Sequence, residues 1–90
     1  MNNEGYMPLH ILPIGQKARV KKLTSDGATR RRMLDLGLIM DTVVEAVLKS
    51  PSGDPVAYTI RGAVIALRSE EASRILVQTY SNKQEDLIWG

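Results

Sequence analysis

Short stretches of alternating apolar and polar residues recur along the chain, and they predict five short strands. In the first, Ala18 and Val20 point to one side, while the lysines and arginines between them point to the other. In the second, Val44, Ala46 and Leu48 share one face. The predicted strands are 16–23, 42–48, 56–61, 63–68 and 75–80. Short strands at this spacing are typical of an all-β barrel or sandwich.

One segment breaks the alternation and has helical spacing instead. Ser25 or Asp26 can cap a helix that runs to about Leu36, with Met33 on its apolar face. Gly37 then fits the left-handed position that commonly follows a helix. We therefore predict one short helix between the first two strands, and a single helical turn before the last strand.

The core is predicted to be aliphatic, because the chain has no Phe, three Tyr and one Trp. Leu38 is expected to fold back onto Met33 where the helix ends. The residues expected to be buried are Met33, Leu36, Val44, Ala46, Ile60, Ile65 and Leu67. Ninety residues make one domain, and about five strands at this size predict a small SH3-like barrel.

Glycine, proline and aspartate mark the turns between the strands. A turn is predicted over 50–55, where Asp54 is expected to accept backbone hydrogen bonds that hold the turn. Gly62 marks a bulge or a tight reversal between the third and fourth strands. Arg61 and Arg68 end these two strands, and structural pairing with nearby acids is expected for both.

The outer parts of the chain and its composition suggest where the protein works. We expect 1–8 to be a flexible leader, 9–80 the domain and 81–90 a tail. The longest apolar run is Ala63–Leu67, far shorter than the roughly 20 residues that a membrane span needs. No Lys or Arg precedes Lys17, so no signal peptide is expected. Without cysteine there is no disulfide framework or thiolate metal site, which fits the cytoplasm.

Positive charge is concentrated in one part of the chain, although the formal net charge is only +2. Between Lys17 and Arg32, seven basic residues face a single acid, Asp26. Such a cluster can steer a protein toward an acidic partner or nucleic acid. It can also protect an edge strand from aggregation.

Three of these charges, Arg30, Arg31 and Arg32, are consecutive in the first half of the predicted helix, and Asp35 is near its end. This order opposes the helix dipole at a cost of about 0.3–1 kcal/mol per charge. A carboxylate of this chain or an acidic partner is therefore expected to compensate. Arg31 and Asp35 lie opposite the apolar face, where they either form a solvated pair or contact a partner. Arg30, Arg31 and Asp35 are the candidate partner-binding residues.

Five blocks of residues, in this order, carry a resemblance to a known family. They are Leu12-Pro13-Ile14-Gly15-Gln16-Lys17-Ala18, Arg32-Met33-Leu34-Asp35-Leu36-Gly37-Leu38, Gly53-Asp54-Pro55-Val56, Arg61-Gly62 and Leu67-Arg68-Ser69-Glu70-Glu71-Ala72. Together they resemble the FeoA family of small bacterial ferrous iron transport proteins, over roughly residues 9–77.

The resemblance implies an SH3-like barrel that works beside the membrane GTPase transporter FeoB in Fe(II) uptake. The motif residues to which it assigns a structural role are Arg32, Gly37, Gly53, Asp54, Pro55, Arg61, Gly62 and Arg68. Met40-Asp41 stands where the family usually has Pro-Gly, and aspartate tolerates the left-handed backbone of such a turn. The module also resembles the C-terminal domain of iron- and manganese-dependent repressors, so a stand-alone relative of that domain is an alternative.

Ligands and catalytic groups are few. Ferrous iron prefers grouped imidazole and carboxylate ligands, but His10 is the only histidine, and Asp54, Glu70 and Glu71 are scattered. We therefore expect no specific metal site and no cofactor. A single histidine without a grouped acid–base pair also gives no basis for an enzyme.

Two function classes remain open. A nucleic-acid-binding barrel would need stacking aromatics within the basic region, but Tyr6, Tyr58, Tyr80 and Trp89 are dispersed. The favoured hypothesis is a cytoplasmic accessory protein that docks on the cytosolic GTPase domain of a FeoB-type transporter and regulates iron uptake.

Overall fold

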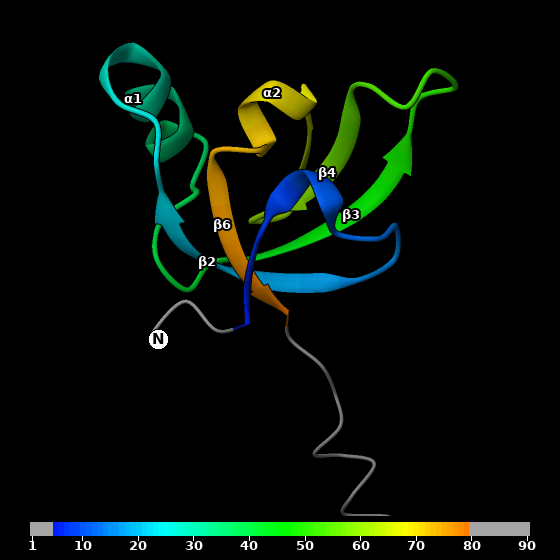
Figure 1. The fold of residues 1–90 in the computed structure, drawn as a ribbon, viewed down its shortest axis with the longest axis horizontal. Helices are drawn as coiled ribbons and strands as arrows, with labels where there is room; N and C mark the ends of the chain where they lie inside the picture. The colour runs from blue at the N-terminus through cyan, green and yellow to red at the C-terminus, as the bar shows by residue number, and fades with distance from the viewer. Residues whose placement is uncertain (1–4, 80–90) are drawn as a thin grey trace, which may run out of the picture.

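The computed structural model describes residues 5–79 of the chain (Figure 1). In chain order the elements are β1 (Tyr6–Pro8), a 3-10 turn η1 (Leu9–Ile11), β2 (Lys17–Leu23), α1 (Gly27–Asp35), β3 (Val43–Lys49), β4 (Val56–Ile60), β5 (Ala63–Leu67), α2 (Ser69–Ala72) and β6 (Ile75–Thr79). The five predicted strands are confirmed, each within one residue at either end.

All strand pairs are antiparallel, and the sheet order is β1-β6-β2-β3-β4-β5. The sheet curves strongly around one core, while η1 and α2 lie against each other over its concave side (Figure 1). The helix α1 stands at one corner of the sheet, opposite the β3–β4 hairpin. The mostly-β, SH3-like architecture predicted from the sequence is confirmed.

The prediction of a leader over residues 1–8 is wrong for Tyr6–Pro8, which form β1. This strand pairs with β6 through Tyr6↔Gln78, Met7↔Val77 and Pro8↔Leu76. Three residues are too few to show a period-2 pattern, so backbone pairing alone identifies the strand. The predicted tail 81–90, and Tyr80 at the end of the last predicted strand, lie outside the described residues.

Every strand except the outer β1 contributes buried residues to the core, which is mainly aliphatic as predicted but also contains one aromatic side chain, Tyr58 of β4. Of the seven residues expected to be buried, Leu36 and Ile65 are only partly buried against the core, and the other five are fully inside. The remaining core residues are Leu9, Leu12, Ala18, Val20, Leu38, Val56, Tyr58, Ala72, Ile75 and Val77. Tyr58 donates its hydroxyl to the Leu9 carbonyl at 3.5 Å, and burial raises its pKa to about 12, with a further contribution from Asp54.

The prediction that Leu48 shares the inner face of its strand is wrong, and a β-bulge explains the difference. Ala46 pairs with Tyr58, but Leu48 pairs with Ala57, so Val47 is an extra residue in β3. One extra residue reverses the alternation of side chains beyond it. Leu48 is therefore 66% exposed. Among residues 5–79, no helix is long and apolar enough to cross a membrane.

Candidate functional site

The helix α1 carries the candidate partner-binding residues, yet Met33 is its single buried residue. Asp26 is the N-cap residue, with extended backbone, but its side chain makes no capping hydrogen bond. Ser25, the other predicted cap, is buried with its Oγ unpartnered by the described residues. The position of the helix start is therefore as predicted, whereas the expected capping interaction is absent. Other contacts hold α1 in place.

The C-terminal end of α1 closes as the sequence predicts. Gly37 has φ +100°, and its N–H donates to the Leu34 carbonyl at 2.9 Å. The Leu38 N–H donates to the Met33 carbonyl at 3.1 Å, and both side chains are buried. This pair of hydrogen bonds is the Schellman motif, which satisfies the last carbonyls of the helix.

Arg61 lies across this helix end. A Cβ built on Gly37 would be 2.5 Å from the Arg61 Cδ. The Arg61 backbone has φ +53° and Gly62 has φ +85°, with Ile60 paired to Ala63, so the two residues form the predicted tight reversal between β4 and β5. The expected pairing of Arg61 with an acid is not found among residues 5–79; its side chain packs on Gly37 instead.

Glu71 connects α1 to α2. One of its carboxylate oxygens pairs with the Arg32 guanidinium, and the other accepts a hydrogen bond from the Arg68 backbone N–H at 3.1 Å. The positive charge of Arg32 is therefore compensated by a carboxylate of the same chain, which is one of the two alternatives that the sequence left open. Arg68 also contacts an acid, but through its backbone N–H, which donates to Glu71, and not through its guanidinium.

Asp54 has a structural partner. Its Oδ1 accepts a hydrogen bond from the Ser69 N–H at 2.8 Å, which joins the 50–55 turn to the first residue of α2. Within the turn, Gly53 donates its N–H to the Ser50 carbonyl at 2.8 Å. The carboxylate thus holds the turn against the following helix, a longer-range contact than the local bonds that were predicted.

The outward side of α1 brings the three candidate residues together. Arg30, Arg31, Leu34 and Asp35 line a shallow hollow of about 320 Å³. Arg30 donates to the Leu23 carbonyl at 3.3 Å, and no ion pair between Arg31 and Asp35 is found in the described part of the chain. The solvated Arg31–Asp35 pair considered above is therefore not formed, and Arg31 is exposed.

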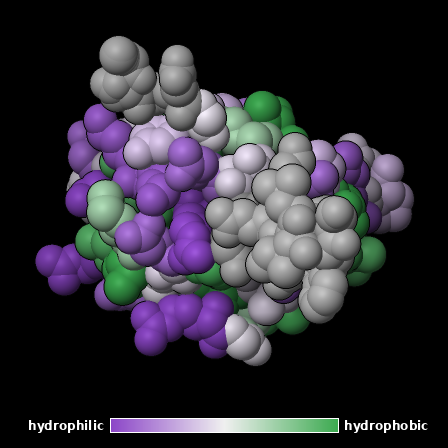
Figure 2. Space-filling view, turned by 90° about the horizontal axis from the view of Figure 1, so that it is seen from below, coloured by the Kyte–Doolittle hydropathy of each residue, from purple (hydrophilic) through white to green (hydrophobic). Residues whose placement is uncertain are grey.

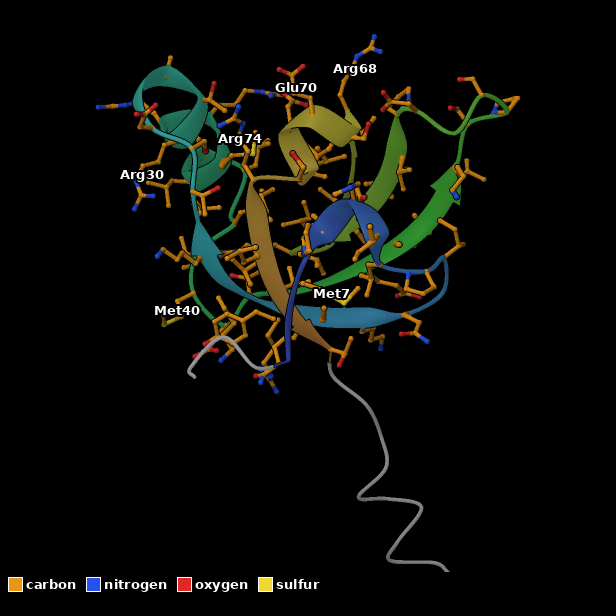
Figure 3. All side chains as sticks on the ribbon, in the orientation of Figure 1. Met7, Arg30, Met40, Arg68, Glu70 and Arg74 are labelled. Carbon is orange, nitrogen blue, oxygen red and sulfur yellow. The ribbon has the colours of Figure 1, made fainter. Side chains whose placement is uncertain are left out.

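A second hollow of about 380 Å³ shares Arg30 and Leu34 with the first. We call it the α1 groove and define it by Lys21, Lys22, Arg30, Leu34, Ile39 and Met40. Leu34, Ile39 and Met40 are 39%, 46% and 66% exposed. Arg30 and Met40 lie on the same side of the molecule (Figure 3). From below, hydrophobic residues on that side lie among hydrophilic ones (Figure 2).

The sequence analysis missed the apolar residues of this groove. The loop after α1 turns at Asp41, which has φ +71°, so the expected left-handed backbone at this departure from the family pattern is confirmed. Lys21 holds the turn through an ion pair of 2.7 Å with Asp41, which also lowers the pKa of Asp41. Two large apolar residues directly before this turn, Ile39 and Met40, were the available signal.

A third hollow, of about 440 Å³, lies between the start of α1 and α2. Asp26, Glu70 and Glu71 line it together with Arg74. No three His, Asp or Glu side chains within residues 5–79 are arranged to hold a metal ion. His10 is exposed on η1.

Comparison with known proteins identifies the family. The model of the FeoA domain matches residues 7–79. The chain belongs to the FeoA family. It is 32% identical over 76 residues to a protein of Porphyromonas gingivalis described as an Fe(2+) transport protein A/Fe(2+) transporter FeoB fusion protein. The match covers 84% of this chain but only 9% of that relative.

Solved FeoA structures have the same fold. The solution structure of FeoA from Chlorobium tepidum has a TM-score of 0.79 at 32% identity, over 83% of this chain and 71% of that one. FeoA from Stenotrophomonas maltophilia, solved with zinc and described as a prokaryotic SH3 domain protein, has a TM-score of 0.73 at 32% identity, over 80% and 89%. The predicted family membership is confirmed.

Proposed function

We propose that this chain is a cytoplasmic, non-enzymatic accessory protein of ferrous iron uptake that docks on the cytosolic GTPase domain of a FeoB-type transporter. Its place in the FeoA family supports a role in ferrous iron transport. The Porphyromonas gingivalis relative supports the choice of partner, because there a similar region and FeoB share one polypeptide. Two regions of one polypeptide stay at a high effective concentration, which favours contact between them.

The observation that carries the docking proposal is the outward face of α1. Arg30 and Arg31 are exposed there, and neither is in an ion pair with another residue of the described chain. Arg32, by contrast, is used internally by Glu71. Exposed charges at the rim of an interface act mainly on the rate of encounter with a partner of opposite charge. An acidic surface on the transporter would supply the carboxylates that Arg30 and Arg31 lack.

The test is association with the immobilised cytosolic domain of the transporter. Arg31→Glu is expected to slow association several-fold, with dissociation nearly unchanged and the fold intact. Lys49→Glu, an equal charge change at the far end of β3, serves as the matched control and is expected to have a much smaller effect. Association of the wild-type chain should slow as ionic strength rises, since the Debye length falls from about 30 Å at 0.01 M to about 8 Å at 0.15 M.

The outcomes separate the parts of the proposal. Equal association rates for Arg31→Glu and Lys49→Glu would place the interface elsewhere on the molecule. No binding by the wild-type chain would contradict docking itself. Salt-dependent binding to an unrelated duplex or single strand would favour the nucleic-acid alternative. That alternative is weakened by Tyr58, which is buried in the core and cannot stack on a base.

A further inference from the structure

The α1 groove combines exposed apolar side chains with positive charges that have no acidic partner among the described residues. Leu34, Ile39 and Met40 expose apolar area around one hollow. Lys22 and Arg30 also line the hollow, and neither forms an ion pair with a carboxylate of residues 5–79. A segment that fits this groove needs carboxylates and large apolar side chains next to each other in sequence.

The chain carries one such segment beyond its described residues. Glu85 and Asp86 are followed directly by Leu87, Ile88 and Trp89. Nowhere else in the sequence do two adjacent acids precede three large apolar residues. The two acids are opposite in charge to Lys22 and Arg30. The three apolar residues are suited to contact Leu34, Ile39 and Met40.

The connection to the groove is short. The last residue of β6, Thr79, pairs with Ala18 of β2, and two positions further along β2 Val20 lines the groove. The Val20 carbonyl accepts from the Asp41 N–H at 2.7 Å, which places the 39–42 turn beside it. Two positions along a strand are about 7 Å. The five residues 80–84 can span about 16 Å.

We propose that the segment 85–89 occupies the α1 groove of its own chain. Its carboxylates then lie against Lys22 and Arg30, and its apolar side chains cover Leu34, Ile39 and Met40. A short connection gives an effective concentration in the millimolar range, so even a weak contact is populated within one molecule. This inference goes beyond transporter docking and does not depend on it. Any partner that uses the groove must displace the segment.

Trp89 makes the test direct, because it is the single tryptophan of the chain. In the full-length wild-type protein its emission is expected to be blue-shifted, and its quenching by acrylamide several-fold weaker than in urea. Met40→Asp is expected to abolish both effects. Leu48→Asp is the matched control, since Leu48 is also 66% exposed but lies on the β3–β4 side, away from α1. It is expected to leave the emission unchanged.

A second variant keeps the test informative if Met40→Asp disturbs the loop. Replacing Glu85 and Asp86 by lysine changes no described residue and should expose Trp89 by charge repulsion. Water-like emission in the wild type, or equal effects of Met40→Asp and Leu48→Asp, would overturn the proposal. So would quenching that strengthens on dilution, which would assign the segment to the groove of a second copy.

Discussion

Replacing Gly37 with alanine tests how α1 is joined to the barrel. The backbone at Gly37 has φ +100°, a region that opposes an L side chain. This conformational strain costs about 1–2 kcal/mol. The new Cβ would also lie 2.5 Å from the Arg61 Cδ, well inside the ordinary carbon–carbon contact of about 3.5–4 Å. Moving the exposed Arg61 side chain aside adds a further cost, smaller than the cost of overpacking a rigid core.

The two contributions separate in a double-mutant cycle. Arg61→Ala removes the clash but leaves the strain at residue 37, so Gly37→Ala in that background is expected to cost only about 1–2 kcal/mol. Gly53→Ala is the matched control, because Gly53 has φ +94° with nothing near its Cβ position. Its cost should be strain alone and should not change with Arg61→Ala.

Urea unfolding of the wild type, the single variants and the double variants measures these costs. The reasoning predicts a lower midpoint for Gly37→Ala than for Gly53→Ala, and a partial recovery with Arg61→Ala. An equal cost of Gly37→Ala in both backgrounds would show that Arg61 does not lie on the helix end. A neutral Gly37→Ala would show that the helix ends elsewhere.

Two further predictions concern the Asp54 hydrogen bond and the buried hydroxyl of Tyr58. Asp54→Ala removes the hydrogen bond to the Ser69 N–H at the start of α2 and should lower the free energy of unfolding by about 0.5–2 kcal/mol. Urea unfolding at neutral pH measures this cost, and an unchanged midpoint would show that the hydrogen bond does not stabilise the fold. The pKa of Tyr58 is raised to about 12, against about 10 in the unfolded chain, so the unfolded state loses its proton first and stability should fall between pH 10 and 12. A Tyr58→Phe variant should lose less stability over this interval, and identical pH profiles would contradict the assignment.

The elements that could be predicted from sequence are those with a local cause. The alternation in β2 and β6 and the spacing of α1 come from side-chain periodicity, and the end of α1 from the backbone freedom of Gly37. The missed features depend on distant pairing. The bulge at Val47 is decided by how β3 pairs with β4, and β1 exists because β6 offers it an edge. Neither leaves a periodic trace in the sequence.

The candidate site divides in the same way. Arg30 and Arg31 remain predicted partner-binding residues, because adjacent arginines in a helix need compensation, whereas the family motif already indicated a structural role for Arg32. Glu71 is 39 residues away from Arg32, so only the fold shows which acid compensates Arg32. The apolar part of the groove could not be predicted, because Ile39 and Met40 are exposed by the turn at Asp41 rather than by a periodic pattern.

The way α1 is held explains how a polar helix can present a defined surface. The helix has one buried residue, Met33, which is too little apolar contact to fix its orientation alone. Two further attachments act at separate points, the Arg32–Glu71 ion pair to α2 and the packing of Arg61 on Gly37 at the helix end. Contacts at separate points restrict rotation of the helix as well as its separation from the sheet. Because all of them use the inner side and the C-terminal end, the side with Arg31 and Asp35 stays open to a partner.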